Sequence, residues 1–404
     1  MSSKKKPKKW MKFRHKVITF LAFLVLRPYA KWKYNIKLDK FSGDKKRPYL
    51  ILLNHQTPFD QFFVGMTFKK AIYYLATEDI FSNGFISSVI RFIVAPIPIR
   101  KQTMDVSAVM NCIRVAKEGG SICIAPEGNR TYSGQTEYMN PSIAALAKKI
   151  NLPVAIYRIE GGYGSEPRWS DCVRKGKMRA YVSEIIEPEE LKALTNEELY
   201  ERIKNGLYVN EAVSDTEFIS SKRAEYLERA IYVCPFCGLS KFESKGNKIK
   251  CLTCQKEIVY GENKKLKGVG FDFPFEFVLD WYNYQKDFVN SLDLNKHVEK
   301  PIFTDVADVK EVIVFKKKVP FMKNAKILLY GDRIELEGEE KTVFSFSEAS
   351  AVTVLGRNKA NIYYNGKVYQ LKGDKRFNAL KYVNIFHRFK NVLRGEENEQ
   401  FLGL

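Results

Sequence analysis

The first half of the chain alternates short apolar runs with segments whose apolar residues recur at a helical period. Four of the runs are apolar almost throughout and are bounded by turn residues, as buried strands are. The predicted strands are residues 48–53, 71–77, 121–125 and 153–161. The predicted helices run from Thr57 to about residue 69 and over residues 79–93, 104–118 and 141–150. Strands that alternate with helices predict an α/β domain, whose ligands usually bind where strands end.

The second half has a different pattern. Amphipathic helices at 196–212 and 220–233 predict a helical connector, and an aromatic-rich helix is expected at 275–293. From about residue 310, seven short strand-like runs precede a helix at 375–394, which suggests a small β-barrel or sandwich. This arrangement resembles the pleckstrin-homology (PH)/GRAM-like superfold. Because many functions use that fold, docking to a membrane or partner and simple packing against the connector both stay open.

Composition narrows the function classes. Hydrophobic residues make up 45% of the 404 residues and aromatic residues 13%. These fractions are enough for packed cores and exclude a disordered chain. The formal net charge of +21 favours polyanionic partners, namely nucleic acid, an anionic membrane surface or phosphorylated substrates.

The N-terminus combines positive charge with an apolar run. The first 16 residues carry eight Lys and Arg side chains and no acidic residue, and residues 17–26 are apolar. Ten apolar residues are too few to span a bilayer, which needs roughly 20. Because aromatic residues flank the run, we predict a helix that lies on the cytoplasmic face of the cell membrane, held also by the basic tail. The alternative is a buried helix of the first domain with a solvated lysine tail.

One of only four histidines, His55, follows the first predicted strand within the sequence NHQTPFD. Asp60 is expected in the first turn of the next helix, so its carboxylate can point back toward the loop. A carboxylate bonded to one imidazole nitrogen fixes the tautomer and leaves the other nitrogen as an oriented base for a substrate hydroxyl. The alternative is structural: Asp60 caps the helix with Thr57 as the N-cap, and His55 is a satisfied buried histidine.

Together with three later segments, this motif resembles the glycerolipid acyltransferase family, which includes the 1-acyl-glycerol-3-phosphate acyltransferases. NHQTPFD matches the first block of that family and APIPIRK the second. APEGNRT resembles the third block, with Asn129 and Thr131 in place of the usual threonine and serine, and LPVAIYRI is similar to the fourth. The resemblance covers roughly residues 20–215 and implies an α/β acyltransferase domain with a mixed sheet flanked by helices.

The resemblance also implies roles for the motif residues. His55 would abstract the proton of an acceptor hydroxyl, and Asp60 would steady the imidazolium that forms. The acceptor would be a lysophospholipid, and the acyl donor a thioester of acyl carrier protein or coenzyme A. Glu127 has the alternative role of an ion-pair partner without ligand contact. The expected substrate-binding residues, which include two phosphate-binding arginines, are Arg100, Glu127, Gly128 and Arg130.

Four of the seven cysteines form two CxxC pairs separated by 13 residues. Two such pairs among glycines and short β-like stretches predict a zinc ribbon, in which four thiolates hold a structural Zn²⁺ ion. The expected ligands are Cys234, Cys237, Cys251 and Cys254. A thioredoxin-like redox pair is the alternative, although neither CxxC lies at a strand-to-helix junction. Residues 241–250 lack a dense face of aromatic and arginine side chains, so nucleic acid is not expected as the main partner.

These observations predict six segments. They are a basic tail with an interfacial helix (1–45), an acyltransferase domain (46–215), a connector (216–230), a four-cysteine zinc ribbon (231–262), an aromatic-rich helical linker (271–300) and a PH/GRAM-like domain (308–396). The predicted function is that of an O-acyltransferase at the membrane surface, which converts 1-acyl-glycerol-3-phosphate to phosphatidate. The alternatives are another acceptor, such as glycerol-3-phosphate or a different lysolipid, and a non-enzymatic protein whose zinc ribbon recruits partners.

Overall fold

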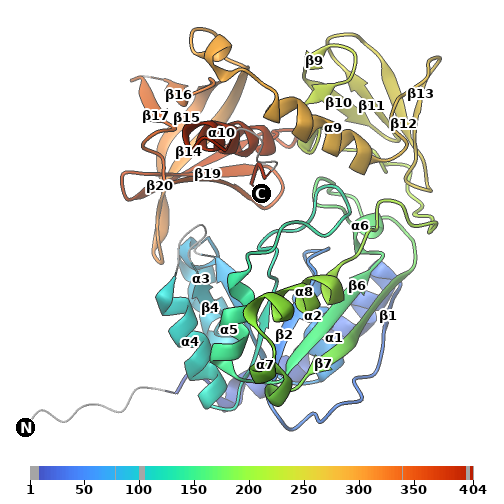
Figure 1. Cartoon of the computed structure of the whole chain (residues 1–404), viewed down its shortest axis with the longest axis vertical. Coiled ribbons are helices and arrows are strands. Elements are labelled where there is room, and N and C mark those ends of the chain that lie inside the picture. The colour runs from blue at the N-terminus through green and yellow to red at the C-terminus, as the bar shows by residue number, and fades with distance from the viewer. Residues whose placement is uncertain (1–8, 78, 100–104, 339, 397–400, 404) are drawn as a thin grey trace, which may run out of the picture. The chain divides into compact units, whose positions relative to one another are not determined.

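The computed structural model describes residues 9–77, 79–99, 105–338, 340–396 and 401–403. The chain divides into two compact units, each described separately below (Figure 1). The first unit takes residues up to 128 together with 136–160 and 178–209. The second unit takes residues 129–135, 161–177 and everything from 210 onward. Two short segments within the predicted acyltransferase range therefore pack in the second unit.

A seven-stranded mixed sheet forms the centre of the first unit, in the order β1-β7-β6-β2-β5-β3-β4. Strands β6, β2, β5, β3 and β4 run parallel to one another, whereas β7 is antiparallel to β6 and β1 is parallel to β7. The strands are Ile36–Leu38 (β1), Leu50–Leu53 (β2), Ile72–Thr77 (β3), Ile97–Ile99 (β4), Ser121–Ile124 (β5), Val154–Glu160 (β6) and Met178–Ile186 (β7). The predicted α/β domain with a mixed sheet is confirmed, although β1 and β7 were not foreseen.

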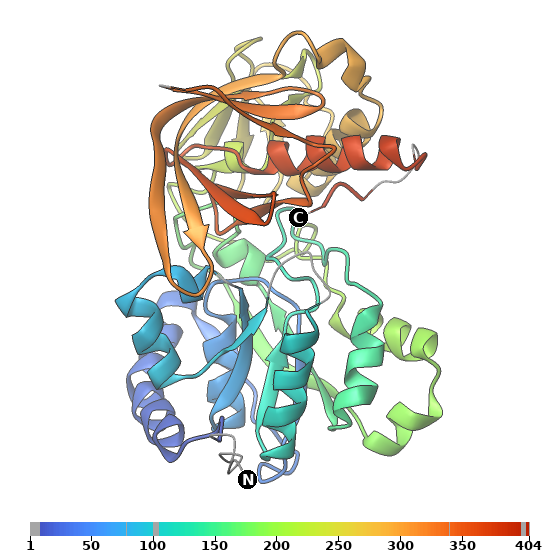
Figure 2. The same cartoon turned by 90° about the vertical axis from the view of Figure 1, so that its left-hand side faces the viewer.

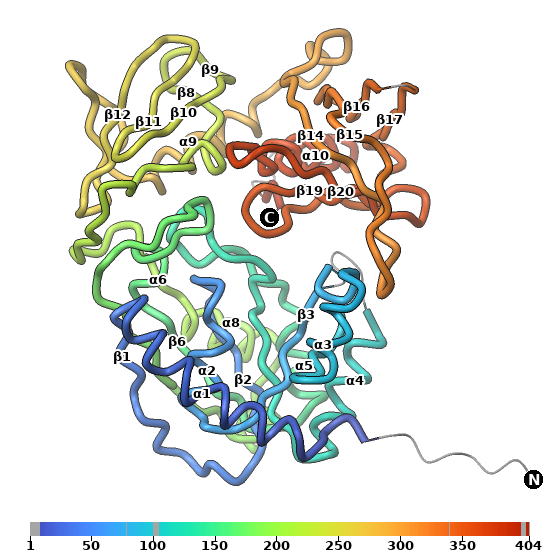
Figure 3. The backbone as a smooth tube through the Cα atoms, turned by 180° about the vertical axis from the view of Figure 1, so that it is seen from behind, coloured from blue at the N-terminus to red at the C-terminus, as the bar shows by residue number. Residues whose placement is uncertain are grey.

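Helices cover both faces of this sheet (Figures 2 and 3). Helices α1, α2 and α3 pack together on one face, and α4, α5, α7 and α8 on the other. Their bounds are Phe13–Tyr34 (α1), Asp60–Phe68 (α2), Phe85–Ile93 (α3), Val106–Lys117 (α4), Ser142–Ile150 (α5), Pro188–Ala193 (α7) and Asn196–Leu207 (α8). Among the described residues, no helix is both long enough and apolar enough to cross a bilayer.

The second unit is built from antiparallel strands. A two-stranded ribbon, β8-β9, and a four-stranded sheet, β10-β11-β12-β13, carry the two CxxC pairs. A curled sheet follows, in the order β17-β16-β15-β14-β20-β19-β18 (Figure 2). The strands of the cysteine region are Val233–Cys234 (β8), Gly238–Leu239 (β9), Phe242–Lys245 (β10), Lys248–Cys251 (β11), Glu257–Tyr260 (β12) and Leu266–Gly268 (β13). Those of the curled sheet are Phe303–Ile313 (β14), Lys317–Leu329 (β15), Arg333–Glu337 (β16), Thr342–Ser345 (β17), Ala351–Leu355 (β18), Lys359–Tyr364 (β19) and Lys367–Gly373 (β20).

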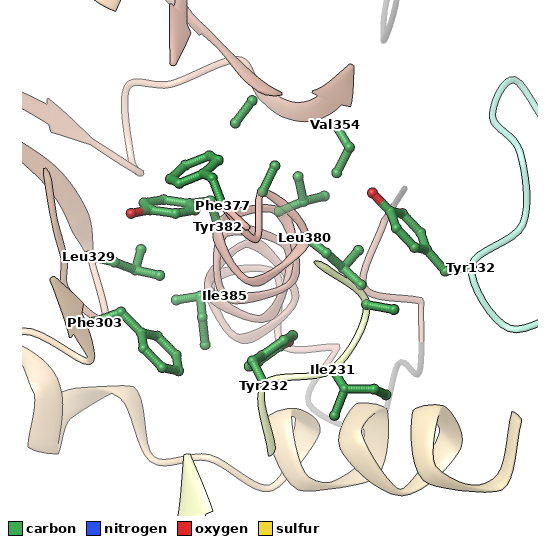
Figure 4. Close-up of a cluster of buried hydrophobic side chains, with 14 of the residues drawn as sticks. Tyr132, Ile231, Tyr232, Phe303, Leu329, Val354, Phe377, Leu380, Tyr382 and Ile385 are labelled. Atoms are coloured by element: carbon green, nitrogen blue, oxygen red, sulfur yellow. The ribbon is translucent and has the colours of Figure 1, made fainter. Parts of the chain in front are cut away.

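One hydrophobic core joins the parts of the second unit around helix α10 (Leu380–Leu393). Leu380, Tyr382 and Ile385 of this helix point into a cluster of side chains from the curled sheet and from the segment before β8 (Figure 4). Seven strands followed by a helix were predicted here, and their number and order agree with the structure. The PH/GRAM-like identity of the domain stays a prediction.

Two helix predictions were wrong. The helix expected at 79–93 is interrupted at Gly84, whose φ of 57° is left-handed, and splits into a 3₁₀ turn (η1, Ile80–Ser82) and α3. The helix expected at 220–233 is a series of turns with one 3₁₀ turn (η2, Leu227–Arg229). In that segment, Ala224 N–H donates to the carbonyl of Gly246 and Tyr226 N–H to Ser244 Oγ, so bonds to the cysteine region replace those of a helix.

Helix α9 (Val278–Asn290) is joined to this turn-rich segment by one buried side chain, Gln285. Gln285 Oε1 accepts hydrogen bonds from the backbone N–H groups of Tyr232 (2.7 Å) and Val233 (3.2 Å). Its Nε2 donates to the carbonyl of Ala230 at 2.9 Å. The amide therefore satisfies backbone groups that have no access to water.

We expect Gln285→Leu, which keeps the side-chain volume but removes the amide, to lower the free energy of unfolding by roughly 2–4 kcal/mol, because it leaves buried backbone groups unpaired. Thermal unfolding of the full chain measures the loss. Asp287→Ala, at an exposed position of the same helix, is the control and should leave the melting temperature nearly unchanged. Equal melting temperatures for Gln285→Leu and the wild type would contradict this prediction.

Candidate active site

The candidate site lies where β2 and β5 end, at the same edge of the first unit's sheet. These two strands are parallel neighbours, so His55, two residues after β2, and Glu127, three residues after β5, come together. Asn54 fixes the exit of β2: its Oδ1 accepts from Ile159 N–H and its Nδ2 donates to the Ile159 carbonyl, both at 2.8 Å. Because Asn54 is fully buried, this pair of hydrogen bonds holds the start of the loop against β6.

His55 and Asp60 form the central pair. His55 Nδ1 lies 2.8 Å from Asp60 Oδ2. The side chain of Asp60 is 1% exposed, whereas that of His55 is 27% exposed. A carboxylate accepts only, so Nδ1 carries the hydrogen in this bond and the lone pair is left on Nε2. The partial exposure of the ring leaves it accessible from solvent.

Asp60 also organises the loop that separates it from His55. Its carboxylate accepts from Gln56 N–H at 2.7 Å, from Thr57 N–H at 3.0 Å and from the Thr57 hydroxyl at 2.7 Å. Helix α2 begins at Asp60 with Phe59 as its N-cap residue, so the expectation that Thr57 caps the helix was wrong. Thr57 instead donates to Asp60, so the carboxylate that accepts from the loop is also the one that contacts His55.

Glu127 is buried behind the loop. Its Oε1 accepts from the backbone N–H of His55 at 2.9 Å, and its Oε2 accepts from Glu137 N–H at 3.0 Å. Burial raises the pKa of this carboxyl group to about 8. Gly128 follows in a turn with a φ of 69°, a left-handed conformation that favours glycine. Glu127 thus connects the end of β5 directly to the backbone of His55.

The structure describes only one of the two predicted phosphate-binding arginines. Arg100 lies outside the described residues. Arg130 belongs to the second unit, where it is buried and its guanidinium donates to the carbonyl of Glu166 at 3.5 Å. The structure therefore brings together His55, Asp60, Glu127 and Gly128 in the first unit.

Sequence reasoning missed Arg168, a buried residue of the second unit. Its guanidinium donates to the carbonyl of Arg130 at 3.0 Å and to Asn129 Oδ1 at 3.1 Å. It also lies 4.5 Å from the centre of the Tyr132 ring. Arg168 therefore fixes the backbone that carries Arg130. Nothing in the local sequence around it, GSEPRWS, distinguishes such a residue from a surface arginine.

The second unit contains a separate cluster of four thiols. The ligand atoms of Cys234, Cys237, Cys251 and Cys254 all lie within 4.8 Å of one another. The Sγ atoms of Cys234 and Cys254 are 3.8 Å apart, and those of Cys237 and Cys251 are 3.6 Å apart. A tetrahedron of sulfurs about 2.3 Å from a central ion has edges of about 3.8 Å. The predicted grouping is confirmed, and its spacing fits a metal ion.

Residues 35–159 match the family model described as Acyltransferase. This range contains the strand ends, His55, Asp60 and Glu127. The chain carries an acyltransferase domain. It is therefore an acyltransferase enzyme, and the alternative of a non-enzymatic binding protein is set aside.

A solved structure also aligns with part of the chain. The crystal structure of the 1-acyl-sn-glycerophosphate (LPA) acyltransferase PlsC from Thermotoga maritima aligns with 19% identity and a TM-score of 0.39. The alignment covers 47% of this chain and 76% of that one. No curated protein sequence matches the chain. The acyltransferase domain is thus identified by the match over residues 35–159.

The raised pKa of Glu127 predicts a pH-dependent stability. Between the ordinary carboxyl pKa of 4.5 and about 8, the folded state holds a proton that the unfolded state releases. Stability contributed by this group therefore falls as the pH rises through that window. The side chain of Glu127→Gln stays neutral. We therefore expect the melting temperature of this variant, relative to that of the wild type, to rise from pH 5 to pH 8, by about 2–4 °C for each kcal/mol of stability that the wild type loses.

The control for this prediction is Glu197→Gln, at an exposed position in the first turn of α8. Its melting temperature should follow that of the wild type at every pH. A constant difference between Glu127→Gln and the wild type from pH 5 to pH 8 would show that Glu127 is ionised throughout.

Proposed function

We propose that the chain transfers a fatty acyl group from a thioester of acyl carrier protein or coenzyme A to the free hydroxyl of a lysophospholipid. The expected acceptor is 1-acyl-glycerol-3-phosphate, and the product is then phosphatidate. The observation that supports this proposal is the 2.8 Å bond between His55 Nδ1 and the buried carboxylate of Asp60, at the end of a strand in an acyltransferase domain. It leaves an accessible imidazole nitrogen aimed away from the carboxylate.

In the proposed reaction, His55 Nε2 takes the proton of the acceptor hydroxyl as the oxygen attacks the thioester carbonyl carbon. The tetrahedral intermediate then collapses. The carbonyl re-forms to give the ester, the carbon–sulfur bond breaks, and the imidazolium gives its proton to the leaving thiolate. Asp60 keeps Nδ1 protonated throughout and stabilises the transient positive charge of the ring. No serine or cysteine nucleophile is required, because the substrate supplies the hydroxyl.

The proposed acceptor site uses the carboxyl ends of the strands. Glu127 would hold His55 in place through its backbone N–H and could also bind the glycerol portion of the acceptor, beside Gly128. On the sequence resemblance, Arg130 would bind the phosphate, since a guanidinium matches two phosphate oxygens. Arg168 would position Arg130 through its carbonyl. Arg100 is proposed as a second phosphate ligand on the sequence resemblance alone.

The four-cysteine cluster is proposed to bind one structural Zn²⁺ ion. Four thiolates occupy all tetrahedral positions, so such an ion would stabilise the fold and leave no open position for substrate. The hairpin that carries Cys234 and Cys237 spans only β8 and β9, two residues each. A metal ion would supply the stability that so small a core does not.

The enzyme is proposed to act at the cytoplasmic face of the cell membrane. Helix α1 exposes large apolar side chains along its length, among them Phe20, Leu24 and Trp32, and it begins just after the lysine-rich N-terminus. Such a helix would lie in the interface with its apolar face among the lipids. The first eight residues, which hold part of the predicted basic tail, lie outside the described residues.

We expect His55→Ala to lower the rate of acyl transfer from a thioester to 1-acyl-glycerol-3-phosphate by about 10²–10⁴-fold, because general-base catalysis is lost. Melting temperature should stay within a few degrees of the wild type, since the ring is partly exposed. His297→Ala, in the second unit, is the matched histidine control and should keep full activity. Substantial transfer by His55→Ala would rule out this mechanism.

For the metal site, we expect protein purified without chelator to contain about one equivalent of zinc, as four thiolates bind one ion. Cys254→Ser should lower the metal content and the melting temperature together. Cys172→Ser is the control, because Cys172 is a free thiol outside the cluster. A wild-type preparation without metal, or a Cys254→Ser variant that retains it, would argue against the zinc site.

A further inference from the structure

Helix α3 presents an apolar surface to solvent. Within it only Ser87 is buried. Phe85 is 83% exposed and Ile86 is 62% exposed, and Phe92 is also exposed. Contiguous exposed apolar surface on a soluble domain usually marks a site of interaction. The chemistry proposed for the active site makes no use of this helix.

Helix α3 packs beside α1 on the same face of the first unit's sheet (Figures 2 and 3). The two helices are joined through Arg14 of α1, whose Nε donates to the Phe92 carbonyl at 3.0 Å. Its guanidinium carbon lies 4.1 Å from the centre of the Phe92 ring. Exposed apolar residues continue along α1 from Phe13 to Trp32, which is 79% exposed. The apolar surface therefore extends over both helices.

The charges on these helices are of one sign. Neither α1 nor α3 contains Asp or Glu. Their cations are Arg14, Lys16, Arg27, Lys31, Lys33 and Arg91. Apolar side chains bordered by Lys and Arg match a bilayer, in which acyl chains receive the apolar groups and anionic headgroups receive the cations. An ordinary protein partner with a hydrophobic surface would not account for the uniform positive charge.

We propose that α3 inserts into an anionic phospholipid bilayer beside α1, so that two helices dock the catalytic domain. The inference rests on the proposed function only for the lipid nature of the acceptor. A single interfacial helix leaves the domain free to rotate about the helix axis, whereas a second point of insertion fixes its orientation.

The orientation matters because α1 also contacts the catalytic loop. Phe59, which lies between His55 and Asp60 in the sequence, packs against Tyr29 and Tyr34 of α1 with ring centres 5.6 Å apart in each pair. The loop is therefore attached to the proposed membrane surface. Docking through both helices would hold the His55 loop at a constant position relative to the lipid headgroups.

Flotation of the full chain with vesicles of phosphatidylcholine and phosphatidylglycerol tests the proposal. The variant is Phe85→Asp/Ile86→Asp, which places two acidic residues in the first turn of α3, where the helix dipole favours them and the helix remains stable. We expect its partition into vesicles to fall by at least about tenfold. The matched control is Val106→Asp, at the first residue of α4 on the opposite face, where Val106 is 69% exposed.

Three results would overturn the proposal. The first is flotation of the α3 variant at the wild-type level. The second is an equal loss in Val106→Asp, which would indicate a general charge effect. The third is that the wild type sediments as a dimer without vesicles, that the α3 variant sediments as a monomer, and that the two float with vesicles equally well. In that case the face would bind a second copy of the chain. Flotation requires no catalysis, so a failed transfer assay in detergent micelles would count against the proposed function alone.

Discussion

The candidate site depends on one buried carboxylate. The Asp60 carboxylate accepts hydrogen bonds from His55 Nδ1, from two backbone N–H groups and from the Thr57 hydroxyl. A single charged group therefore determines the shape of the loop and the orientation of the imidazole. Hydrogen bonds to a carboxylate are among the stronger ones in proteins. Removal of the charge would therefore release the loop and the ring together, which is why the motif needs an aspartate at this position.

The sheet supplies the fixed points around that carboxylate. Asn54 ties the end of β2 to β6, and Glu127 at the end of β5 accepts from the backbone of His55. The loop is thus held from both neighbouring strands, while Phe59 connects it to α1 on one face. A rigid sheet edge carrying a short, heavily bonded loop keeps a base oriented without the substrate present.

The site could be predicted largely because its signals are local. His55 and Asp60 lie five residues apart, and each CxxC pair is closed by a short turn, so spacing alone brings these groups together. Predictions from local patterns were wrong where contacts between residues far apart in the sequence determine the local structure. Residues 220–233 have an amphipathic pattern, yet Ala224 and Tyr226 bond to the cysteine region instead of forming a helix. Arg168 reaches Arg130 across 38 residues, which no local pattern reveals.

The tautomer of His55 tests the proposed mechanism most directly, and NMR on protein with ¹⁵N-labelled imidazole rings measures it. The chain has only four histidines, so the His55→Ala spectrum assigns the signals of this ring. We expect the neutral form of the ring to carry its hydrogen on Nδ1 and to leave Nε2 unprotonated, and we expect this pattern to change in Asp60→Asn. A ring that carries its hydrogen on Nε2 would have no base directed at the substrate, and would contradict the proposed mechanism.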